Sequence, residues 1–202
     1  VAGEYFNNGV ANSDVTVKIG SVNWTTLGTV TVDNANQISL KNTNNSKNES
    51  GNLTIPDLAG NELTASTWTV YVDNTPPVIT EVEPKSIKSG DVAVVTGSGF
   101  KNGAAESTVK LGSSTASAST FTYSVVSDTR IEITGGTGDL SDQIVVITDP
   151  AGNELSDSDY KLTIDNTPPS VSSVTVASIK NGSTTVINGS GFHTSVNGAT
   201  EN

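Results

Sequence analysis

Residues 73–77 read Asp-Asn-Thr-Pro-Pro, and residues 165–169 read the same five residues again, 92 positions later. The same offset relates residues 57–63 (Asp-Leu-Ala-Gly-Asn-Glu-Leu) to residues 149–155 (Asp-Pro-Ala-Gly-Asn-Glu-Leu). Shorter matches at this offset occur elsewhere in the chain. Independent segments that share one offset indicate a duplicated structural unit. The chain of 202 residues is therefore a tandem array with a period of 92 residues.

The repeated unit has the alternation that β-strands require. Polar and apolar residues alternate over 130–134 and 160–165, and the earlier copy of the second run places Trp68 and Val72 on one face. Clusters of Gly, Pro, Asn and Asp interrupt these runs about every 8–12 residues, whereas no segment has a capped helical period. We expect an all-β chain of tandem immunoglobulin-like sandwiches, one complete and two partial.

The repeat divides the chain into three units, 1–74, 75–166 and 167–202. The middle unit has every expected strand, whereas the first lacks its leading strands and the last has only two. An incomplete sandwich exposes an unpaired strand edge. We therefore expect 167–202 of one subunit to complete 1–74 of the next by strand addition, so that copies of the chain join head to tail. The alternative is that these residues are an excerpt of a longer, continuous array.

Charge and composition exclude several classes of function. The 10 Lys and Arg residues against 21 Asp and Glu residues give a net charge of −11, which repels nucleic acid and favours cations. There is no Cys, which excludes disulfides and thiolate metal sites, and His193 is the single histidine. No apolar run approaches the ~20 residues of a membrane-spanning helix, so we expect no membrane insertion within this chain.

No group of residues has the pattern of an active site, and we predict that the chain is not an enzyme. His193 has no counterpart in the other copies and is expected in an exposed loop. The acidic cluster of Asp157 and Asp159 is absent from the first copy and is expected in a solvated loop. The Gly-rich stretch 135–139 leads into neither a helix nor a Lys, as a phosphate-binding loop requires.

Carboxylates recur where consecutive units meet. In a sandwich of about seven strands the last two form a hairpin, so Asp149 and Asp165 lie at opposite poles of one unit. Asp73, which ends the first unit, is then expected beside the 149–154 loop of the middle unit. Ca²⁺ takes oxygen ligands of this kind, so we predict a Ca²⁺ site at the joint. The candidate ligands are Asp73, Asp149, Asn153 and Glu154 at this joint, and Asp165 with Asp57, Asn61 and Glu62 of a following unit at the next.

The alternative is that the Asp-x-Ala-Gly-Asn segments are only turns. Gly60 and Gly152 would then supply the positive φ. The carboxylates of Asp57 and Asp149 would accept hydrogen bonds from their own backbone. In either case the Pro-Pro pair at 76–77 restricts φ and favours an extended linker.

Asn-x-Ser/Thr sequons are dense in this chain. A chain rich in Asn, Ser and Thr forms such triplets by chance, but glycans would also suit an exported β-rich surface. We expect some of the sequons to be glycosylated. The candidate sites are Asn23, Asn44, Asn48, Asn52, Asn181 and Asn188.

Two motifs are similar to known families. Val-Thr-Gly-Ser-Gly-Phe at 95–100 resembles the first half of an IPT/TIG-type immunoglobulin-like domain. The Asp-x-Ala-Gly-Asn-Glu loop, followed by a strand that ends in Asp-Asn-Thr-Pro-Pro, resembles the immunoglobulin-like repeats of large bacterial and archaeal surface proteins. Together these motifs cover nearly the whole chain.

This resemblance implies an extracellular protein of the cell surface. Such arrays form adhesin stalks, S-layers and filaments, and in several of them Ca²⁺ stiffens the joints between domains. We therefore predict a structural repeat subunit of a surface filament or S-layer, whose partners are copies of itself. A stalk segment of a large adhesin is the alternative, and an accessory module of a secreted hydrolase is a third.

Overall fold

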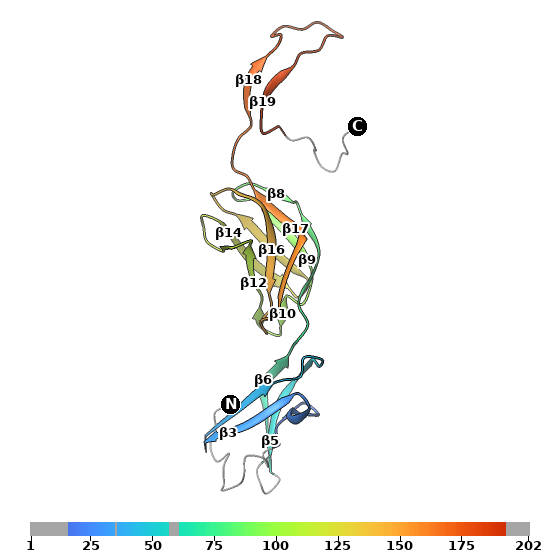
Figure 1. Cartoon of the computed structure of the whole chain (residues 1–202), viewed down its shortest axis with the longest axis vertical. Coiled ribbons are helices and arrows are strands. Elements are labelled where there is room, and N and C mark those ends of the chain that lie inside the picture. Colours follow the sequence, from blue (N-terminus) through green and yellow to red (C-terminus); the bar gives the residue numbers. More distant parts are fainter. Residues whose placement is uncertain (1–15, 35, 57–60, 193–202) are drawn as a thin grey trace.

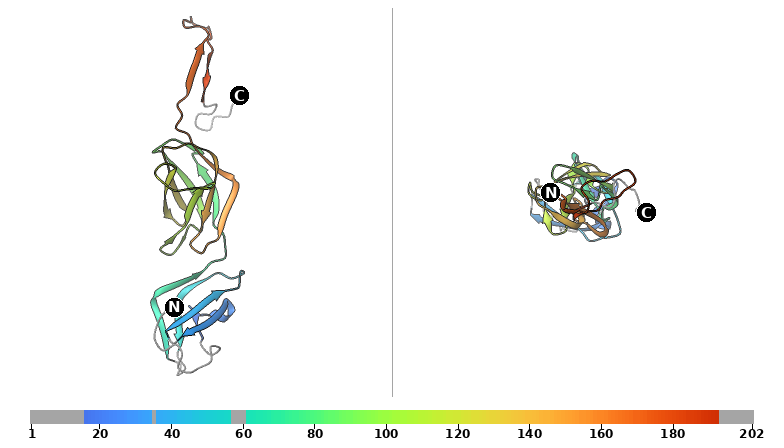
Figure 2. Two further views of the ribbon diagram at one scale, coloured as in Figure 1. Left: turned by 60° about the vertical axis from the view of Figure 1, so that its left-hand side comes forward. Right: turned by 90° about the horizontal axis from the view of Figure 1, so that it is seen from above.

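The computed structural model describes residues 16–34, 36–56 and 61–192, and these residues form β-strands almost throughout. A first unit, a complete middle unit and a two-stranded segment follow one another along the long axis (Figure 1). Figure 2 shows the same order from another side. The predicted all-β fold of tandem immunoglobulin-like sandwiches is confirmed.

The middle unit consists of two sheets, of order β14-β15-β9-β7 and β13-β12-β16-β17-β8. The strands of the first sheet are β7 (Val78–Glu83), β9 (Val92–Ser98), β14 (Phe121–Ser127) and β15 (Arg130–Gly135). Those of the second are β8 (Ser86–Ile87), β12 (Thr108–Leu111), β13 (Ser114–Thr115), β16 (Leu140–Thr148) and β17 (Glu154–Ile164). A short hairpin of β10 (Lys101–Asn102) and β11 (Ala105–Glu106) belongs to neither sheet.

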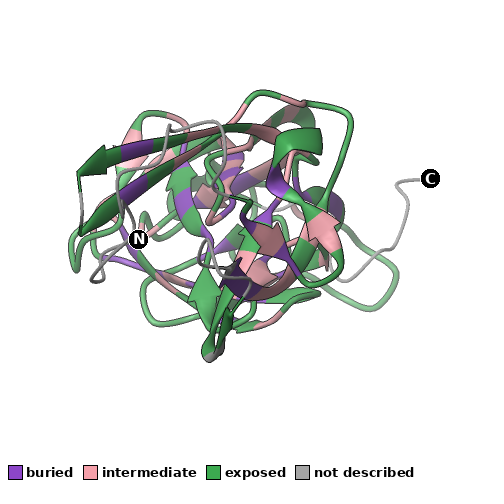
Figure 3. Cartoon of the chain, turned by 90° about the horizontal axis from the view of Figure 1, so that it is seen from below, coloured by how far each residue is buried: buried purple, intermediate pink, exposed green. Residues whose placement is uncertain are grey.

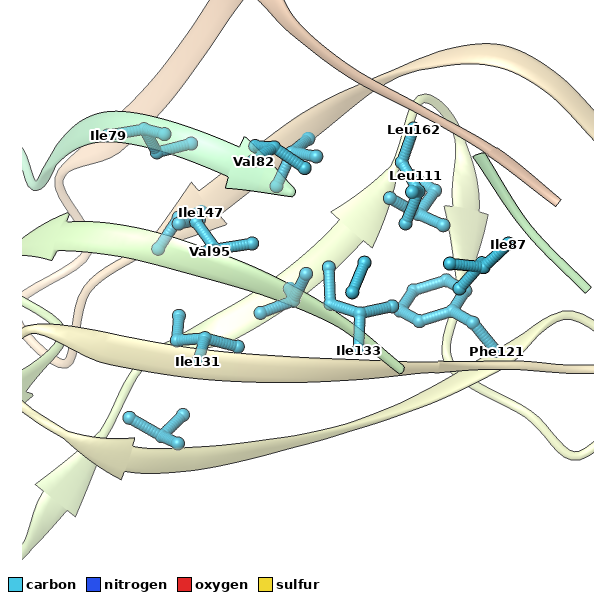
Figure 4. Close-up of a cluster of buried hydrophobic side chains, with 14 of the residues drawn as sticks. Ile79, Val82, Ile87, Val95, Leu111, Phe121, Ile131, Ile133, Ile147 and Leu162 are labelled. Atoms are coloured by element: carbon cyan, nitrogen blue, oxygen red, sulfur yellow. The ribbon is translucent and has the colours of Figure 1, made fainter. Parts of the chain in front are cut away.

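The inner faces of these two sheets form one core. Strand β15 contributes Ile131 and Ile133, and the facing sheet contributes Leu111, Ile147 and Leu162 (Figure 4). All five side chains are fully buried. Burial of an aliphatic side chain of this size stabilises a fold by about 1.5–3 kcal/mol. The alternation seen in the sequence therefore becomes the contact between the two layers.

The Gly-Ser-Gly-Phe motif ends β9 in a way that requires glycine. A Cβ on Gly97 would lie 1.9 Å from the carbonyl oxygen of Val78, so β7 and β9 approach closely only because residue 97 has no side chain. Gly99 has a φ of +78°, a conformation that other residues rarely adopt. The resulting turn directs Phe100 into the core, where it is fully buried.

The first unit repeats the strand order of the middle unit from β12 onward. Its sheet has the order β2-β1-β5-β6, and a separate hairpin pairs β3 with β4. A short 3₁₀ helix, η2, connects β2 to β3. The bounds are β1 (Lys18–Ile19), β2 (Val22–Asn23), η2 (Trp24–Thr26), β3 (Gly28–Asn34), β4 (Gln37–Asn42), β5 (Glu49–Pro56) and β6 (Glu62–Val72).

The first unit has a core of its own. Val17 and Leu27 are fully buried, and Trp24 is buried with its indole nitrogen donating to the carbonyl oxygen of Thr29 at 3.0 Å. Figure 3 shows buried residues on the strands and mainly exposed residues on the loops around them. The first and middle units therefore have two separate cores.

Trp68 differs from its counterpart in the middle unit. It corresponds to Tyr160, which packs against the middle core, but 59% of the Trp68 surface is exposed. In the middle unit, β7 adds Ile79 and Val82 to the core that Tyr160 contacts. Within the described part of the first unit, no strand corresponds to β7. The alternating pattern thus predicts the sheet face on which Trp68 lies, but not whether other residues cover that face.

The last segment is a hairpin of β18 (Ser170–Val174) and β19 (Ile187–Ser190) that repeats β7 and β9. Its pairs Ser170–Ser190 and Val174–Ile187 lie 92 residues after the equivalent pairs of β7 with β9, and both hairpins shift register at the same place. Nearly all its side chains are exposed. His193 lies outside the described residues.

The prediction of a loop at Asp157–Asp159 is wrong, because this segment lies within β17. The register between β16 and β17 shifts here, and Asp157 Oδ1 accepts a hydrogen bond from the backbone nitrogen of Asp159 at 3.0 Å. The segment is therefore a bulge in a long strand. Bulge residues are polar and interrupt the alternation, so in the sequence they resemble a loop.

Candidate functional site

The joint between the first and middle units begins after Val72, the last residue of β6. Asp73 Oδ1 accepts a hydrogen bond from the backbone nitrogen of Thr75 at 2.9 Å, which forms a tight Asx turn. Pro77 is buried, and its Cα lies 3.2 Å from the position that a Cβ on Gly99 would take. The linker is therefore held by the first unit at one end and by the middle unit at the other.

Asn48 attaches the linker to its own unit. Its side-chain nitrogen donates to Asp73 Oδ1 at 3.1 Å and to Thr75 Oγ1 at 2.6 Å. Its side-chain oxygen accepts a hydrogen bond from the backbone nitrogen of Asn74 at 2.8 Å. One amide side chain thus bonds to three consecutive linker residues, an arrangement that we call the exit clamp.

The side chain of Asn74 points back into the first unit. Its nitrogen donates to the carbonyl oxygens of Asn44 at 3.2 Å and Lys47 at 2.6 Å. Its oxygen accepts a hydrogen bond from the side-chain nitrogen of Asn42 at 3.0 Å. Because both ends of this amide are bonded, the direction in which the chain leaves the unit is fixed.

The exit of the middle unit has an equivalent clamp, in which a carboxylate replaces the amide and bonds to two linker residues instead of three. Asp165 Oδ1 again accepts from the backbone nitrogen two residues on, Thr167, at 2.9 Å. Asp139 replaces Asn48 and accepts from the backbone nitrogen of Asn166 at 2.8 Å and from Thr167 Oγ1 at 3.0 Å. The hydrogen bond from the Asn166 backbone, and then that from the Thr167 hydroxyl, lower the pKa of Asp139 below its ordinary value of 3.8.

Three contacts cross the joint between the first and middle units. Asp73 Oδ2 accepts from the side-chain nitrogen of Asn102 at 3.1 Å. The backbone oxygen of Asp73 accepts from the side-chain nitrogen of Asn153 at 3.0 Å. The Tyr71 hydroxyl lies 2.5 Å from the position that a Cβ on Gly103 would take, so the ring lies against a glycine backbone. Two separate loops of the middle unit therefore contact the end of β6.

Asp149 holds the second of these loops in place. It is buried, and its Oδ1 accepts from the backbone nitrogens of Ala151 at 2.8 Å and Asn153 at 2.9 Å. Its Oδ2 accepts from the side-chain nitrogen of Asn153 at 2.8 Å. Gly152 has a φ of +94°, as the turn interpretation expects. The side-chain nitrogen of Asn153 thus bridges an oxygen of Asp149 and an oxygen of Asp73.

The structure brings three of the predicted Ca²⁺ ligands together at the joint. They are Asp73, Asp149 and Asn153, and the hydrogen bonds of Asn153 connect them. Glu154, the next residue, is exposed at the start of β17. Asp165 directly follows β17, a strand that begins beside this joint and runs to the opposite end of the middle unit (Figure 1).

The candidate ligands of the first unit lie away from this joint. Glu62 begins β6 and forms an ion pair with Lys18 at 3.1 Å. Asn61 precedes it, and Asp57 lies outside the described residues. Within 16–34, 36–56 and 61–192, no three His, Cys, Asp or Glu side chains are grouped to hold a metal ion.

The oxygens at the joint are nevertheless of the kind that Ca²⁺ binds. The carboxylates of Asp73 and Asp149 and the amide oxygen of Asn153 are hard ligands, and Ca²⁺ takes six to eight of these with water among them. An N–H group of Asn153 now bridges the two acidic residues. An ion at this point requires the Asn153 amide to turn its oxygen inward.

The predicted glycosylation sites differ in what their side chains contact. Asn23 and Asn181 are exposed, the first at the end of β2 and the second in a turn. Asn48 donates two hydrogen bonds within the exit clamp, so a glycan on its nitrogen would displace at least one of them. The other three take part in side-chain hydrogen bonds: Asn44 with Thr26, Asn52 with Thr69 and Asn188 with Ser173.

The roles of Asn48, Asp139 and Asn102 in the linker contacts were not predicted from the sequence. Asn48 and Asp139 are equivalent in the clamp but lie 91 rather than 92 residues apart, because the segment between the preceding hairpin and the clamp is 43–47 in the first unit and only 136–138 in the middle unit. Asn102 ends β10 in a short polar hairpin whose sequence does not distinguish it from other polar hairpins. One signal in the sequence pointed to the clamp residues. The backbone N–H groups of Asn74 and Asn166 come just after the last strand of a unit, and such groups require hydrogen-bond acceptors.

The sequence of the middle unit and its two-sheet sandwich fold together indicate its family. Residues 77–167 match the model of the IPT/TIG domain. The middle unit is an IPT/TIG domain. The resemblance of the motif at 95–100 to this family is thereby confirmed. A comparison with characterised proteins finds no match. The helix that the described residues form is too short to cross a membrane.

Several solved structures are similar to the chain. The extracellular region of plexin A4 is 15% identical with a TM-score of 0.46, and the match covers 79% of this chain and 13% of plexin. SGBP-B of a Bacteroides ovatus mixed-linkage glucan utilization locus, solved with a mixed-linkage heptasaccharide, is 15% identical with a TM-score of 0.32, covering 78% and 40%. The insect immune protein hemolin is 13% identical with a TM-score of 0.22, covering 74% and 38%. This chain thus spans less than half of each of these proteins.

Proposed function

We propose that the chain is a structural repeat subunit of an extracellular surface assembly, a filament or an S-layer, in which sandwich units follow one another end to end. The exit clamp carries this proposal. It recurs at Asp73 and at Asp165 with the same turn and the same linker sequence. A clamp at each exit favours a stiff rod, whereas a binding module on a tether needs only a flexible linker.

Two modes of joining are compatible with this function. The β18–β19 hairpin exposes Val174 and Ile187, whose equivalents Val82 and Val95 are buried in the middle core. Cover for this face comes from the first unit of a neighbouring subunit, by strand addition, or from residues that continue the array. In both modes the units are joined head to tail.

We also propose that Ca²⁺ binds at the joint through the carboxylates of Asp73 and Asp149. The support is that these two residues come from consecutive units, and that the Asn153 amide donates both to the Asp149 carboxylate and to the backbone oxygen of Asp73. Extracellular modules bind Ca²⁺ with a Kd of about 10⁻⁴–10⁻³ M. A tenfold excess of the ion over Kd adds about 1.4 kcal/mol to stability.

Calorimetry tests the Ca²⁺ proposal. Millimolar Ca²⁺ is expected to raise the melting temperature, and excess EDTA to lower it. Asp73→Asn, which keeps the size of the side chain but removes its charge, is expected to abolish the difference. Identical melting curves in Ca²⁺ and in EDTA for the unsubstituted chain would contradict binding.

Immunogold electron microscopy of intact source cells tests the surface assembly. Antibodies to the middle unit are expected to label the cell surface densely and at regular spacing. Sparse labelling of single projections would favour the adhesin stalk instead. Labelling that appears only after permeabilisation would contradict both functions.

A further inference from the structure

We infer that Asp73, Asn102 and Asn153 form a metal-independent lock that fixes the orientation of the first unit relative to the middle unit. We call these three residues the joint lock. Asp73 accepts hydrogen bonds from the middle unit on two different atoms, Oδ2 from Asn102 and the backbone oxygen from Asn153. Its third acceptor atom, Oδ1, is held within the first unit by Asn48 and Thr75. One residue is therefore bonded to both units at once.

Two bonds to separate loops restrain rotation as well as distance. Asn102 lies on β10, and Asn153 lies in the turn between β16 and β17. Because a hydrogen bond weakens steeply when its angle or length changes, rotation about the linker breaks at least one of the two. The Tyr71 ring against the backbone of Gly103 adds a third point of contact, and it is close enough that a Cβ at residue 103 would lie 2.5 Å from the hydroxyl.

The amide of Asn153 bridges the two acidic residues at the joint. Its nitrogen donates to Asp149 Oδ2 at 2.8 Å and to the backbone oxygen of Asp73 at 3.0 Å. Asp149 is 5% exposed, and its two oxygens accept three N–H donors from its own loop. A buried carboxylate with such donors is tolerated without a counter-ion. The closed joint therefore does not require a metal.

The surroundings of the joint lock favour these bonds over bonds to water. Asp73, Asn102 and Asn153 are each partly buried. Partial burial strengthens a hydrogen bond, and it makes a donor or acceptor that has lost its partner more costly. Neighbouring domains with a small interface otherwise move relative to one another by default. The joint lock therefore has a measurable consequence, which is a restricted angle between the units.

Pulsed EPR on the whole chain tests the joint lock. The chain has no Cys, so spin labels can be attached at Thr31→Cys on β3 and Ser124→Cys on β14, both exposed. The distance distribution between the labels is expected to be narrow in EDTA, where no ion can replace the bonds of the joint lock. In the same background, Asn102→Ala is expected to broaden it by about twofold or more, because an unlocked linker samples many orientations.

A second variant and a matched control complete the experiment. Asn153→Asp keeps the size of the side chain but replaces the donor by an acceptor, and it is expected to broaden the distribution in EDTA. Asn61→Ala removes the equivalent side chain of the first unit, away from this joint, and is expected to leave it unchanged. Circular dichroism confirms that each variant is folded.

The joint lock is overturned if the distribution stays narrow in folded Asn102→Ala or Asn153→Asp. It is also overturned if the distribution of the unsubstituted chain is narrow only when Ca²⁺ is present. This result is independent of the proposed function, because the joint lock concerns two units of one purified chain. Regular surface labelling with a mobile joint would reject the joint lock alone, and a rigid joint without surface labelling would reject the function alone.

Discussion

The middle unit and the segment 170–192 share one sequence pattern and one strand register, but their side chains have opposite burial. Phe100 is fully buried, whereas 48% of the equivalent Phe192 is exposed. Val95 is fully buried, whereas 53% of the equivalent Ile187 is exposed. Strand pairing is thus decided within the hairpin, whereas a core needs strands that lie far away in the sequence.

In both hairpins the two strands approach each other closely at a glycine. A Cβ would lie 1.9 Å from a carbonyl oxygen of the paired strand at Gly97 and also at Gly189. The hairpin therefore keeps its register with or without cover. A hairpin without a packed face is at best marginally stable in water, so the segment depends on whatever covers it.

The largest expected effect on stability distinguishes Phe100 from Phe192. Phe100→Ala is expected to destabilise the middle unit by about 3–5 kcal/mol, because it leaves a cavity in a packed core. Phe192→Ala is expected to leave the unfolding of the middle unit unchanged. Urea unfolding followed by far-UV circular dichroism measures both variants.

Tryptophan fluorescence provides the internal control for this pair. Trp24 and Trp68 are the two tryptophans, and both lie in the first unit. Their unfolding transition is expected to be the same in both variants, because the two units have separate cores. A comparable loss of middle-unit stability in Phe192→Ala would show that the segment packs on that unit, which contradicts the comparison.

Gly97→Ala is expected to have the next largest effect. The added methyl group meets the backbone oxygen of Val78, so β7 must move, and overpacking of this kind costs about 1–3 kcal/mol. Gly189→Ala places a methyl group against the equivalent oxygen of Ser170 and is expected to loosen only the β18–β19 hairpin. Amide hydrogen exchange of β7 and of β18 distinguishes the two results. Equal protection of β7 in Gly97→Ala and in the unsubstituted chain would contradict the close approach as the cause.

Most of the fold could be predicted from the sequence, because the repeat compares the chain with itself. Alternation at 130–134 and 160–165 gave strands β15 and β17, and the shared offset gave the order of the units. The exposure of Trp68 could not be predicted, because alternation defines a face but not what covers it. The bulge at Asp157–Asp159 could not be predicted either, because its polar residues have the composition of a loop.

The joint could be predicted in part. The opposite poles of a sandwich placed Asp73 beside Asp149 and Asn153, and the structure has them in one hydrogen-bonded group. Asn48 was not predicted, because the segment that follows the hairpin differs in length between the two units and moves Asn48 out of the 92-residue register. Asn102 was not predicted, because its partner lies in another unit and no local pattern marks such a contact.

The two exit clamps also share a sequence pattern but differ in one residue. Replacing Asn48 is expected to change stability less than Phe100→Ala or Gly97→Ala. Asn48→Ala removes bonds to Asp73, Asn74 and Thr75 and is expected to destabilise the first unit by about 0.5–1.5 kcal/mol, because these bonds compete with water. Fluorescence of the buried Trp24 during urea unfolding measures the loss. Asn45→Ala, an exposed neighbour in the same loop, is the control and is expected to have no effect.

The smallest expected effect is a pH dependence that Asp139 gives to the second clamp. The pKa of Asp139 is lowered in the folded chain, chiefly by the backbone N–H of Asn166. The carboxylate is then ionised more readily in the folded than in the unfolded state, so its contribution to stability is present above the unfolded pKa, near 3.8, and is lost as the pH falls through the lower folded value. The equivalent Asn48 does not titrate.

The amide resonance of Asn166 in an NMR titration reports this change directly. It is expected to shift at a pH below the ordinary value for Asp. Asp139→Asn gives the second clamp the amide of the first, and it is expected to keep the linker turn while it removes the shift. A shift that persists in this variant would assign the titration to another carboxylate. The two clamps would then differ in sequence but not in their response to pH.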